Sequence, residues 1–592
     1  MRHSRIHRGS RIAALSCLAA AFAVTALAAD ETAADPRASR FRGPVALVTA
    51  DEGRSLLTAN RRSGTISVID VDRQVVRHEF TAGRKLSSLI ALSDRRTLLA
   101  TDEGAHELIL LERRQDAVRV AARLAVPPYP VTVQADSNGE ACFVASLWSR
   151  RLAIVDIQPA GTRGSPGLTL RKTIALPFPP RLQILAGGRL IVADGFSGRL
   201  AVVDPDRGEV ETVRELPAHN IRGLALNADG SRLLVSHQTL NALARTTPDD
   251  VHWGMLMGNV VGSLKLSHVL DKDVDILRGS LVHPLGQPGN AAADPADVAL
   301  ASGGRVVVAL AGVGEIGLFR EDDSEFHRIS VGGRPTTMVL SSDGTRVFVA
   351  DELRDTVSVV DPGVRRRLAE ISLGPQPELT LADRGERLFY DGRLSHDGWM
   401  SCHSCHSDGH TSGLLNDNLG DGSFGAPKRV ISLLGVARTR PWAWSGEVTE
   451  LEAQIRKSIE TTMRGKTPAD ESVLALTAFL KTLPPAPPLA EMEEADRGAI
   501  DRGRRVFEVR QCARCHSPPD YTSEGAYDVG LKDELGRSKY HPPSLRGVSQ
   551  RDRLFHDNRA ANLDEVFSRF KHQVDELPAH ELLDLLVFLK SL

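Results

Sequence analysis

The sequence predicts a multidomain protein in which an N-terminal all-β part, a seven-bladed propeller, precedes a C-terminal all-α part. Three observations lead to this fold class. A short apolar strand pattern recurs through the first two thirds of the 592 residues. The alternation of apolar and polar residues that is typical of strands stops near residue 385, and amphipathic helical segments follow. The helical part also contains one pattern of cysteine and histidine twice, with similar flanking sequences.

The composition is that of an ordinary soluble protein. Hydrophobic residues make up 42% and charged residues 25% of the chain, which excludes wholesale disorder. The 73 Lys and Arg nearly balance the 75 Asp and Glu, for a net charge of −2. A balanced chain without a basic run has no electrostatic footprint for nucleic acid. The six cysteines are too few for a disulfide-stapled scaffold.

Residues 1–28 are typical of a secretory signal peptide. Arginines precede an apolar run over residues 12–29, and Ala26-Leu27-Ala28 fits the cleavage pattern. An uncleaved anchor is the alternative, since about 18 apolar residues is close to the minimum for a membrane span. We expect cleavage, export to the periplasm or beyond, and no membrane span after cleavage.

Seven copies of the strand pattern define the predicted propeller, residues 40–384. Aligned on a small residue near the strand end, the copies fall at Ala59, Ala100, Ala145, Ala193, Ser236, Ala309 and Ala350. Short strands with turn signals at about 40-residue spacing are typical of a propeller with one four-stranded blade per repeat. A sandwich array with accidental spacing is the alternative. The motifs resemble the YVTN family of bacterial propellers.

One spacing of 73 residues marks an insertion between the fifth and sixth copies, within 238–300. The insertion contains His252, Trp253, Met255, Met257, His268 and His283. These residues could reach over one propeller face to a cofactor or partner. We favour the simpler interpretation, in which Trp and Met form a small satellite core and the histidines are solvated.

Two CxxCH motifs predict two covalently bound haem c groups. They are Cys402-His403-Ser404-Cys405-His406 and Cys512-Ala513-Arg514-Cys515-His516. Two thiols on one helical turn reach the two vinyl groups of haem, and the next histidine, His406 or His516, binds the iron. Zinc is the rival metal, but a four-ligand site would have to join cysteine pairs 110 residues apart. A thiol redox pair would not need the histidine.

Similar flanks predict that one cytochrome c-like fold occurs twice. Each motif follows a Gly-containing helical segment, and each unit closes with a Leu-rich helix. We assign the first cytochrome c domain to 385–483 and the second to 498–592. The Pro-rich linker 484–497 is a short, stiff spacer that holds the two domains close together.

Further short segments occur around these motifs in a specific order. They are Phe389-Tyr390-Asp391-Gly392-Arg393-Leu394-Ser395, Ala443-Trp444-Ser445-Gly446, Leu451-Glu452-Ala453-Gln454, Pro543-Ser544-Leu545-Arg546-Gly547-Val548 and Phe555-His556-Asp557-Asn558-Arg559. This order resembles the dihaem bacterial cytochrome c peroxidase and MauG family. The resemblance implies a peroxidatic haem on His406, an electron-transfer haem on His516 and Trp444 as the bridge between them. The alternative for Trp444 is a core aromatic residue that packs the domain interface.

The chain departs from the family pattern at both haems. Where the family often has a distal histidine for the first haem, this chain has no ligand at 421–423, which implies an open iron as in the MauG subgroup. His410 is a local alternative, although it is only four residues past His406. The family's distal ligand of the second haem falls at Phe570, which cannot bind iron. His572 is the nearest donor, and we predict that it binds this iron together with His516.

The catalytic acid of the family falls near Thr461, where this chain has no acid. A peroxide site needs a base that takes the first proton and returns it to the leaving oxygen. Glu460 with Gln454 is the candidate pair, and a solvated helix residue is the alternative for Glu460. Calcium binding is not supported, since Lys428 and Arg429 occupy the region of the family's calcium ligand.

These observations favour an exported dihaem c-type oxidoreductase of the peroxidase or MauG type. Hydrogen peroxide would react at the open haem, with electrons relayed through the second haem and Trp444. An electron-donor protein or a protein substrate would dock near the haem domains or the propeller. The alternative function is a non-catalytic dihaem electron-transfer or sensor protein with a propeller docking domain. A lactonase-like activity of the propeller is a third possibility, but no catalytic constellation is present there.

Overall fold

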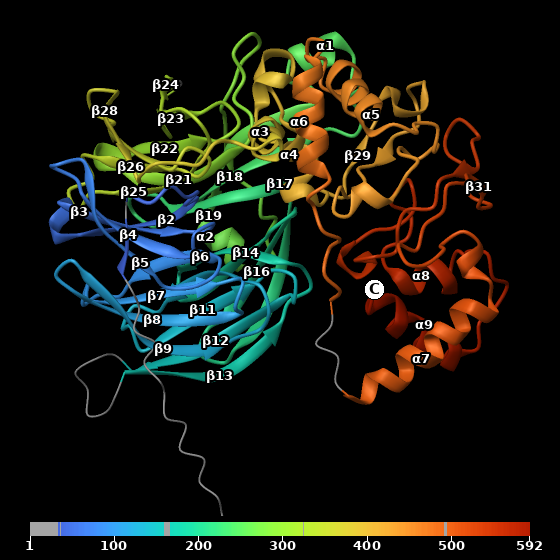
Figure 1. Ribbon diagram of the computed structural model, residues 1–592, viewed down its shortest axis with the longest axis horizontal. Helices are drawn as coiled ribbons and strands as arrows, with labels where there is room; N and C mark the ends of the chain where they lie inside the picture. The colour runs from blue at the N-terminus through green and yellow to red at the C-terminus, as the bar shows by residue number, and fades with distance from the viewer. Residues whose placement is uncertain (1–32, 36, 159–165, 324, 490–493) are drawn as a thin grey trace, which may run out of the picture.

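The computed structural model describes residues 33–35, 37–158, 166–323, 325–489 and 494–592. The predicted signal peptide lies outside the described residues. Figure 1 shows a β-rich N-terminal body with the helical C-terminal part along one side of it. Among the described residues, no helix has both the length and the apolar character needed to cross a membrane.

The N-terminal part consists of antiparallel sheets that follow one another along the chain. The first three sheets contain, in chain order, β2 (Pro44–Ala50), β3 (Ser55–Asn60), β4 (Thr65–Asp70) and β5 (Val75–Thr81); β6 (Leu86–Ala91), β7 (Thr97–Asp102), β8 (Glu107–Arg114) and β9 (Ala117–Ala125); and β10 (Pro130–Ala135), β11 (Ala141–Ser146), β12 (Arg151–Gln158) and β13 (Gly167–Ala175). The short strand β1 (Ala33–Ala34) pairs with β5 at the outer edge of the first sheet.

The remaining sheets include one of seven strands. It contains β14 (Pro180–Ala186), β15 (Arg189–Asp194), β16 (Ser197–Asp204), β17 (Glu209–Leu226), β18 (Arg232–Leu240), β19 (Met257–Lys265) and β20 (Leu281–Pro284). Two four-stranded sheets follow, with β21 (Pro295–Ala301), β22 (Arg305–Leu310), β23 (Glu315–Arg320) and β24 (His327–Ser330), and then β25 (Pro335–Leu340), β26 (Val347–Asp351), β27 (Thr356–Asp361) and β28 (Arg366–Ser372). The 18-residue strand β17 pairs with β16 along its first half and with β18 along its second.

The sheets close into a ring. The strands β2, β6, β10, β14, β17, β21 and β25 contact one another in this order, and β25 contacts β2 again. In each sheet, the strand that pairs with the ring strand is buried on both faces, as in β3, β7 and β11. It is buried because each sheet packs between two neighbouring sheets. This explains why these strands have continuous apolar sequences. The prediction of an all-β N-terminal part is confirmed, and the closed ring of sheets is the arrangement of a propeller.

The C-terminal part is mainly helical. Its α-helices are α3 (Leu381–Phe389), α4 (Cys402–Cys405), α5 (Leu451–Lys457), α6 (Asp470–Leu480), α7 (Glu494–Val509), α8 (Leu563–Ser568) and α9 (Ala579–Lys590). Short helical turns are η3 (Gly392–Leu394), η4 (His396–Gly398), η5 (Ser407–Gly409), η6 (Leu419–Asp421), η7 (Val436–Arg438), η9 (Cys512–Arg514) and η10 (Val548–Gln550), and η8 (Ser458–Thr462) is a π-helical turn. Two-residue strands form the pairs β29 (Leu415–Asn416) with β30 (Lys428–Arg429) and β31 (Tyr527–Asp528) with β32 (Lys539–Tyr540).

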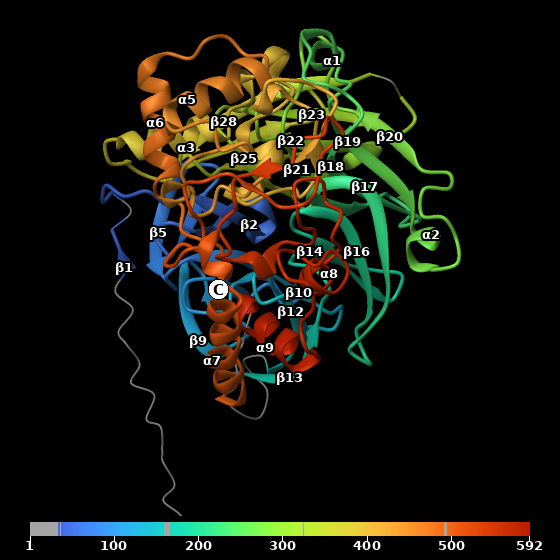
Figure 2. The same ribbon diagram turned by 90° about the vertical axis from the view of Figure 1, so that its right-hand side faces the viewer.

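Each CxxCH region is preceded by one helix and followed by another, and the two helices pack on each other in the same way in both regions. α3 packs on α6, and α7 packs on α9. In both pairs a glycine makes the contact: a Cβ added at Gly385 would lie 1.9 Å from the Ala475 carbonyl oxygen, and one at Gly503 would lie 2.0 Å from that of Asp584. Figures 1 and 2 place the two units one below the other along the same side of the propeller.

The insertion between β18 and β19 differs from our expectation. It forms α1 (Pro248–His252), and α2 (Leu266–Leu270) follows β19. Trp253 and Met255 are 64% and 57% exposed, so the predicted satellite core of Trp and Met is wrong for these two residues. Met257 is buried, but against the helical part of the chain rather than within the insertion. The insertion therefore serves as a contact to the helical part.

Candidate functional site

The first CxxCH motif is folded as one helical turn whose reactive groups face a common cavity. α4 follows Ser401 and carries both cysteines, and the His406 amide donates to the Cys402 carbonyl at 2.9 Å. Cys402, Cys405 and His406 all line a cavity of about 270 Å³. Two thiols and one imidazole at a single surface are the groups that covalent haem attachment needs.

The walls of this cavity are mainly apolar. Phe389 of α3, Leu451 and Ile455 of α5, and Leu476 and Leu480 of α6 line it, and they belong to one hydrophobic cluster. Helices before and after the motif thus converge on the motif. Burying a flat apolar group against such walls is favourable, because apolar surface leaves water.

Burial sets the protonation state of His406. It lowers the pKa of this imidazole to about 4, so the ring is neutral at pH 7. Its Nδ1 atom is buried and has no hydrogen-bond partner among the described residues. Neutral imidazole is the form that binds metals, so His406 is in the state that an iron ligand requires.

Two arginines at the same cavity, Arg429 buried and Arg551 partly buried, also fit haem. Arg429 Nε donates to the Phe555 carbonyl at 3.2 Å, and Arg551 Nη2 donates to the Ser544 carbonyl at 2.7 Å. Within the described ranges neither guanidinium pairs with a carboxylate. Burial lowers the pKa of Arg429 to about 9 and that of Arg551 to about 10. Buried charges are unfavourable unless they are paired, and the two propionates of haem would supply the opposite charge.

The second CxxCH motif has a similar environment in the other helical unit. η9 begins at Cys512, and His516 Nδ1 lies 3.1 Å from the Tyr521 carbonyl oxygen. Burial and, to a smaller extent, the charge of nearby His572 lower the pKa of His516 to about 4. The ring of His572 lies 5.5 Å from that of Phe555, and its Nδ1 is buried with no partner in the described part of the chain. His572 is thus near enough to His516 to affect its pKa, and its role as the second iron ligand stays a prediction.

Trp444 lies between the cavity and the second helical unit. It is 8% exposed, lines the cavity and donates from Nε1 to the Arg429 carbonyl at 2.8 Å. Its ring is 6.3 Å from those of Tyr540 and His556, which stack on each other at 4.1 Å. This position suits both a bridge between two haems and a packing residue at the interface.

The two residues of the predicted catalytic pair differ in position. Gln454 lines the cavity, and its Nε2 donates to Ser458 Oγ at 3.1 Å. Its Oε1 is buried without a partner among the residues described. Glu460 lies in η8, whose neighbours Ile459 and Thr461 line the cavity, but Glu460 is not among the lining residues. Met463, which follows η8, is a further lining residue that the sequence reasoning did not consider.

The residues near the family's distal histidine and calcium ligand form contacts with other side chains. Asp421 borders the cavity, but it pairs with Arg537 and lies 3.5 Å from Lys428 Nζ. Lys428 Nζ also lies 3.0 Å from Asp533 Oδ2, so an ammonium group links the two helical units here. His410 is not among the residues that line the cavity; its Nδ1 lies 3.0 Å from Ser432 Oγ, and its ring lies 4.9 Å from that of Phe196 in the propeller.

The propeller holds the outer side of the first motif. Asp294 accepts hydrogen bonds from Ser401 and, at 2.6 Å, from Ser404. His219 Nε2 lies 2.9 Å from the Ser404 carbonyl oxygen, and Asn220 Nδ2 donates to the same oxygen at 3.2 Å. Thus Asp294, just before β21, and His219 and Asn220, in the middle of β17, hold the turn that carries the two cysteines.

Asp408, just after the motif, forms the central charge contact with the propeller. It pairs with Arg181 and, at 3.1 Å, with Arg222. Burial alone would raise the pKa of Asp408, but the charges of Arg181 and Arg222 outweigh this effect and hold the pKa well below its usual value. The sequence carried no signal for these contacts, because each one joins residues that are far apart in the chain.

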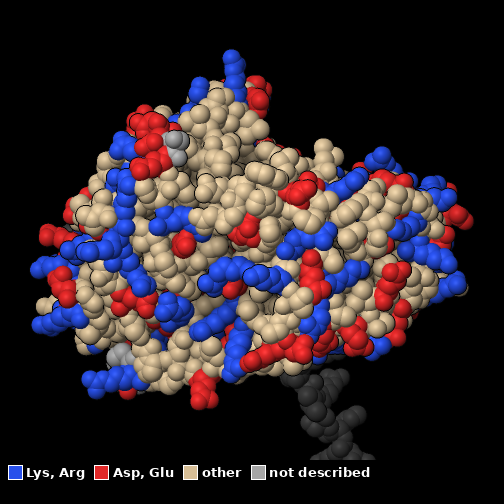
Figure 3. Space-filling model, turned by 90° about the horizontal axis from the view of Figure 1, so that it is seen from above, with Lys and Arg blue, Asp and Glu red and all other residues tan. Residues whose placement is uncertain are grey.

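The charges on one face of the molecule show no dominant patch. On the face seen in Figure 3, basic and acidic side chains are interspersed. This agrees with the balanced composition and gives no sign of a highly charged partner on that face.

Comparisons with known proteins agree with the geometry of the helical part. The family model described as di-haem cytochrome c peroxidase matches residues 380–483. The methylamine utilization protein MauG of Methylorubrum extorquens is 28% identical over 271 residues, covering 35% of this chain and 76% of that protein. Cytochrome c551 peroxidase of Nitrosomonas europaea is 24% identical over 269 residues, covering 36% of this chain and 79% of that protein. A solved structure of hydrazine synthase from Kuenenia stuttgartiensis aligns with 54% of this chain and 96% of its own, at a TM-score of 0.47 and 16% identity.

Proposed function

Since the C-terminal part of this chain is related to the dihaem cytochrome c peroxidases and MauG proteins, we propose that the protein is an exported dihaem c-type oxidoreductase that uses hydrogen peroxide at its first haem. The observation that carries the proposal is the apolar cavity that Cys402, Cys405 and His406 line together. Bound there, haem supplies an iron at which peroxide can be reduced.

The finer organisation is part of the same proposal. Counting the seven-stranded sheet as two blades joined by β17 gives seven blades. The repeated Gly-mediated helix pair supports two cytochrome c domains, 385–483 and 498–592. Each would hold one haem c covalently, through Cys402 and Cys405 or through Cys512 and Cys515.

The residues around the first cavity would position the haem and the peroxide. His406 would hold the iron from one side, and Arg429 and Arg551 would neutralise the propionates. Gln454 Oε1, buried without a partner within the described residues, would accept a hydrogen bond from peroxide. An amide cannot take up the proton, so Glu460 remains the candidate base and would act through a water molecule.

Electrons would reach the first cavity from the second haem. His516 and His572 would both bind the second iron, which leaves no open position there. Trp444, between the cavity and the stacked rings of Tyr540 and His556, would lie on the path. An electron-donor protein or a protein substrate would deliver the electrons by docking near the haem domains or the propeller.

A non-catalytic electron-transfer protein is the second candidate, and one observation favours it. Met463 lines the first cavity, and a thioether is an iron ligand in cytochromes c. If Met463 binds the first iron, that iron has no position for peroxide.

Low-temperature EPR of the fully ferric, haem-loaded protein distinguishes the two functions. One high-spin and one low-spin haem, together with peroxide-dependent oxidation of a reduced c-type cytochrome, would support the enzyme. Two low-spin haems in the wild type, with a high-spin signal created by Met463→Leu, would establish the electron-transfer function instead. Met255→Leu is the matched control, since Met255 is exposed and is not among the residues that line the cavity.

A further inference from the structure

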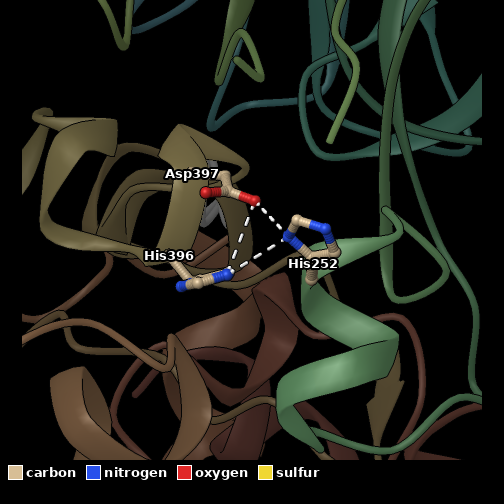
Figure 4. A group of neighbouring side chains, drawn as sticks. All are labelled: His252, His396 and Asp397. Atoms are coloured by element: carbon tan, nitrogen blue, oxygen red, sulfur yellow. Dashed lines mark hydrogen bonds and ion pairs between the residues drawn. The ribbon is translucent and has the colours of Figure 1, made fainter. Parts of the chain in front are cut away.

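Three metal-binding side chains converge where the propeller insertion meets the helical part. His252 ends α1 of the insertion, whereas His396 and Asp397 form η4, a few residues before Cys402. Figure 4 shows both imidazoles and one carboxylate oxygen directed at a common point. One ligand atom from each residue lies within 4.8 Å of the other two.

The distances between these atoms fit a small divalent cation. His252 Nδ1 lies 2.7 Å from Asp397 Oδ2, His396 Nε2 lies 3.5 Å from the same oxygen, and the two ring nitrogens are 3.4 Å apart. Ligand atoms around a tetrahedral zinc ion with bonds of about 2.0–2.1 Å are about 3.3–3.4 Å apart. Two of the three separations match this value, and the third would lengthen by about 0.6 Å on binding.

A hydrogen bond alone explains only part of the arrangement. A proton on His252 Nδ1 accounts for the short contact with Asp397. It does not account for His396, whose Nε2 lies 3.4 Å from His252 Nδ1 and 3.5 Å from Asp397 Oδ2, both longer than the usual hydrogen-bond range of about 2.7–3.2 Å. A single cation at the common point satisfies all three lone pairs at once.

The backbone around the three residues is held from outside the cluster. The Gly289 amide donates to Asp397 Oδ2 at 3.0 Å, and the His396 amide donates to the Met463 carbonyl at 2.9 Å. Trp399 Nε1 donates to the His252 carbonyl at 3.1 Å. Such supporting contacts orient ligands and strengthen metal binding, and here they come from three separate segments.

We propose that His252, His396 and Asp397 form a binding site for a late first-row divalent cation, with Zn²⁺ as the representative ion. Two imidazoles and a carboxylate are ligands that this class of metals prefers. The His252 and His396 side chains are 38% and 41% exposed, so water or another small ligand can complete the coordination. The ion would tie the insertion to the segment that leads into the first CxxCH motif.

Zinc binding to the full-length, haem-loaded protein tests the site. After removal of metal with EDTA, calorimetric titration with ZnCl₂ should show one tight site per chain. We expect His252→Ala and His396→Ala each to weaken it at least 100-fold. His268→Ala is the matched control, since His268 lies in the neighbouring helix α2 and bonds only to the Arg278 carbonyl among the contacts described, and it should bind zinc like the wild type.

Zinc K-edge X-ray absorption of the wild type gives a readout that does not depend on the variants folding. The spectrum of the one-equivalent complex should contain scattering from two imidazoles. A coordination shell without two imidazoles, or an unchanged affinity in folded His252→Ala and His396→Ala proteins, would overturn the proposal. Absence of a stoichiometric site in the wild type would do the same.

Discussion

Replacing Asp408 with asparagine removes the negative charge that compensates Arg181 and Arg222 at the contact between the first haem segment and the propeller. Removing one partner of a buried ion pair costs about 3–5 kcal/mol, because the remaining charge stays buried. The three side chains are 28%, 20% and 14% exposed, in the order Asp408, Arg181, Arg222. Solvent therefore reduces the effect, and we expect a loss of about 2 kcal/mol in the stability of this contact.

Hydrogen exchange measured by mass spectrometry reports this local stability. A loss of about 2 kcal/mol corresponds to about 30-fold faster exchange in peptides that cover residues 407–414. Peptides from the interior of the propeller, such as those covering β11 and β12, should exchange as in the wild type. Asp273→Asn is the control, since Asp273 is exposed and pairs with an exposed lysine. An acceleration below threefold at 407–414, or an equal acceleration throughout the propeller, would refute the reasoning.

The pH dependence of the stability difference between the wild type and Asp408→Asn provides a second check. The pKa of Asp408 in the folded protein lies well below 3.8. Its contribution to stability is therefore complete above the unfolded-state pKa of about 3.9 and is lost only as the pH falls through the folded-state value. The difference between wild type and Asp408→Asn should be constant from about pH 5 to pH 8 and should shrink only in stronger acid.

Four further substitutions test the proposed redox site. His572→Ala should convert the low-spin EPR signal of the second haem to high spin, and an unchanged spectrum would remove His572 as a ligand. Trp444→Phe should slow electron transfer between the haems in stopped-flow measurements while haem content stays constant; an unchanged rate would leave Trp444 with only a packing role. Glu460→Gln should lower the turnover number with peroxide about 100-fold if Glu460 is the base, and Gln454→Leu should lower it less, about tenfold. Wild-type turnover in Glu460→Gln would mean that the base lies elsewhere.

Features that depend on local spacing could be predicted from the sequence. The strands of the propeller repeat because each lies between two neighbouring sheets, which requires continuous apolar sequence. The CxxCH spacing alone brings Cys402, Cys405 and His406 to one surface, since a single helical turn joins them. The Gly-containing helices before each motif were also visible as repeated sequence.

Features that depend on contacts between distant segments of the chain could not be predicted. Arg429 and Arg551 lie far apart in the chain, and neither sequence environment indicates that both border one cavity. Trp253 and Met255 have the sequence of a small core, but the insertion packs other side chains, Val251 and Met257, against the helical part. The sequence predicts that His252 is solvated, because its partners, His396 and Asp397, lie 144 and 145 residues further along the chain.

The attachment of the first motif to the propeller imposes an order on assembly. Asp294 accepts hydrogen bonds from the Ser401 and Ser404 side chains, and His219 and Asn220 contact the Ser404 carbonyl, in the turn that carries Cys402 and Cys405. Burial raises the pKa of both thiols to about 12. Once this turn is docked, helices enclose the thiols on one side and the propeller encloses their backbone on the other. On the proposed function, haem would therefore be joined to the chain while the turn is still undocked, and maturation of the cofactor would come before the final closure of the two halves of the molecule.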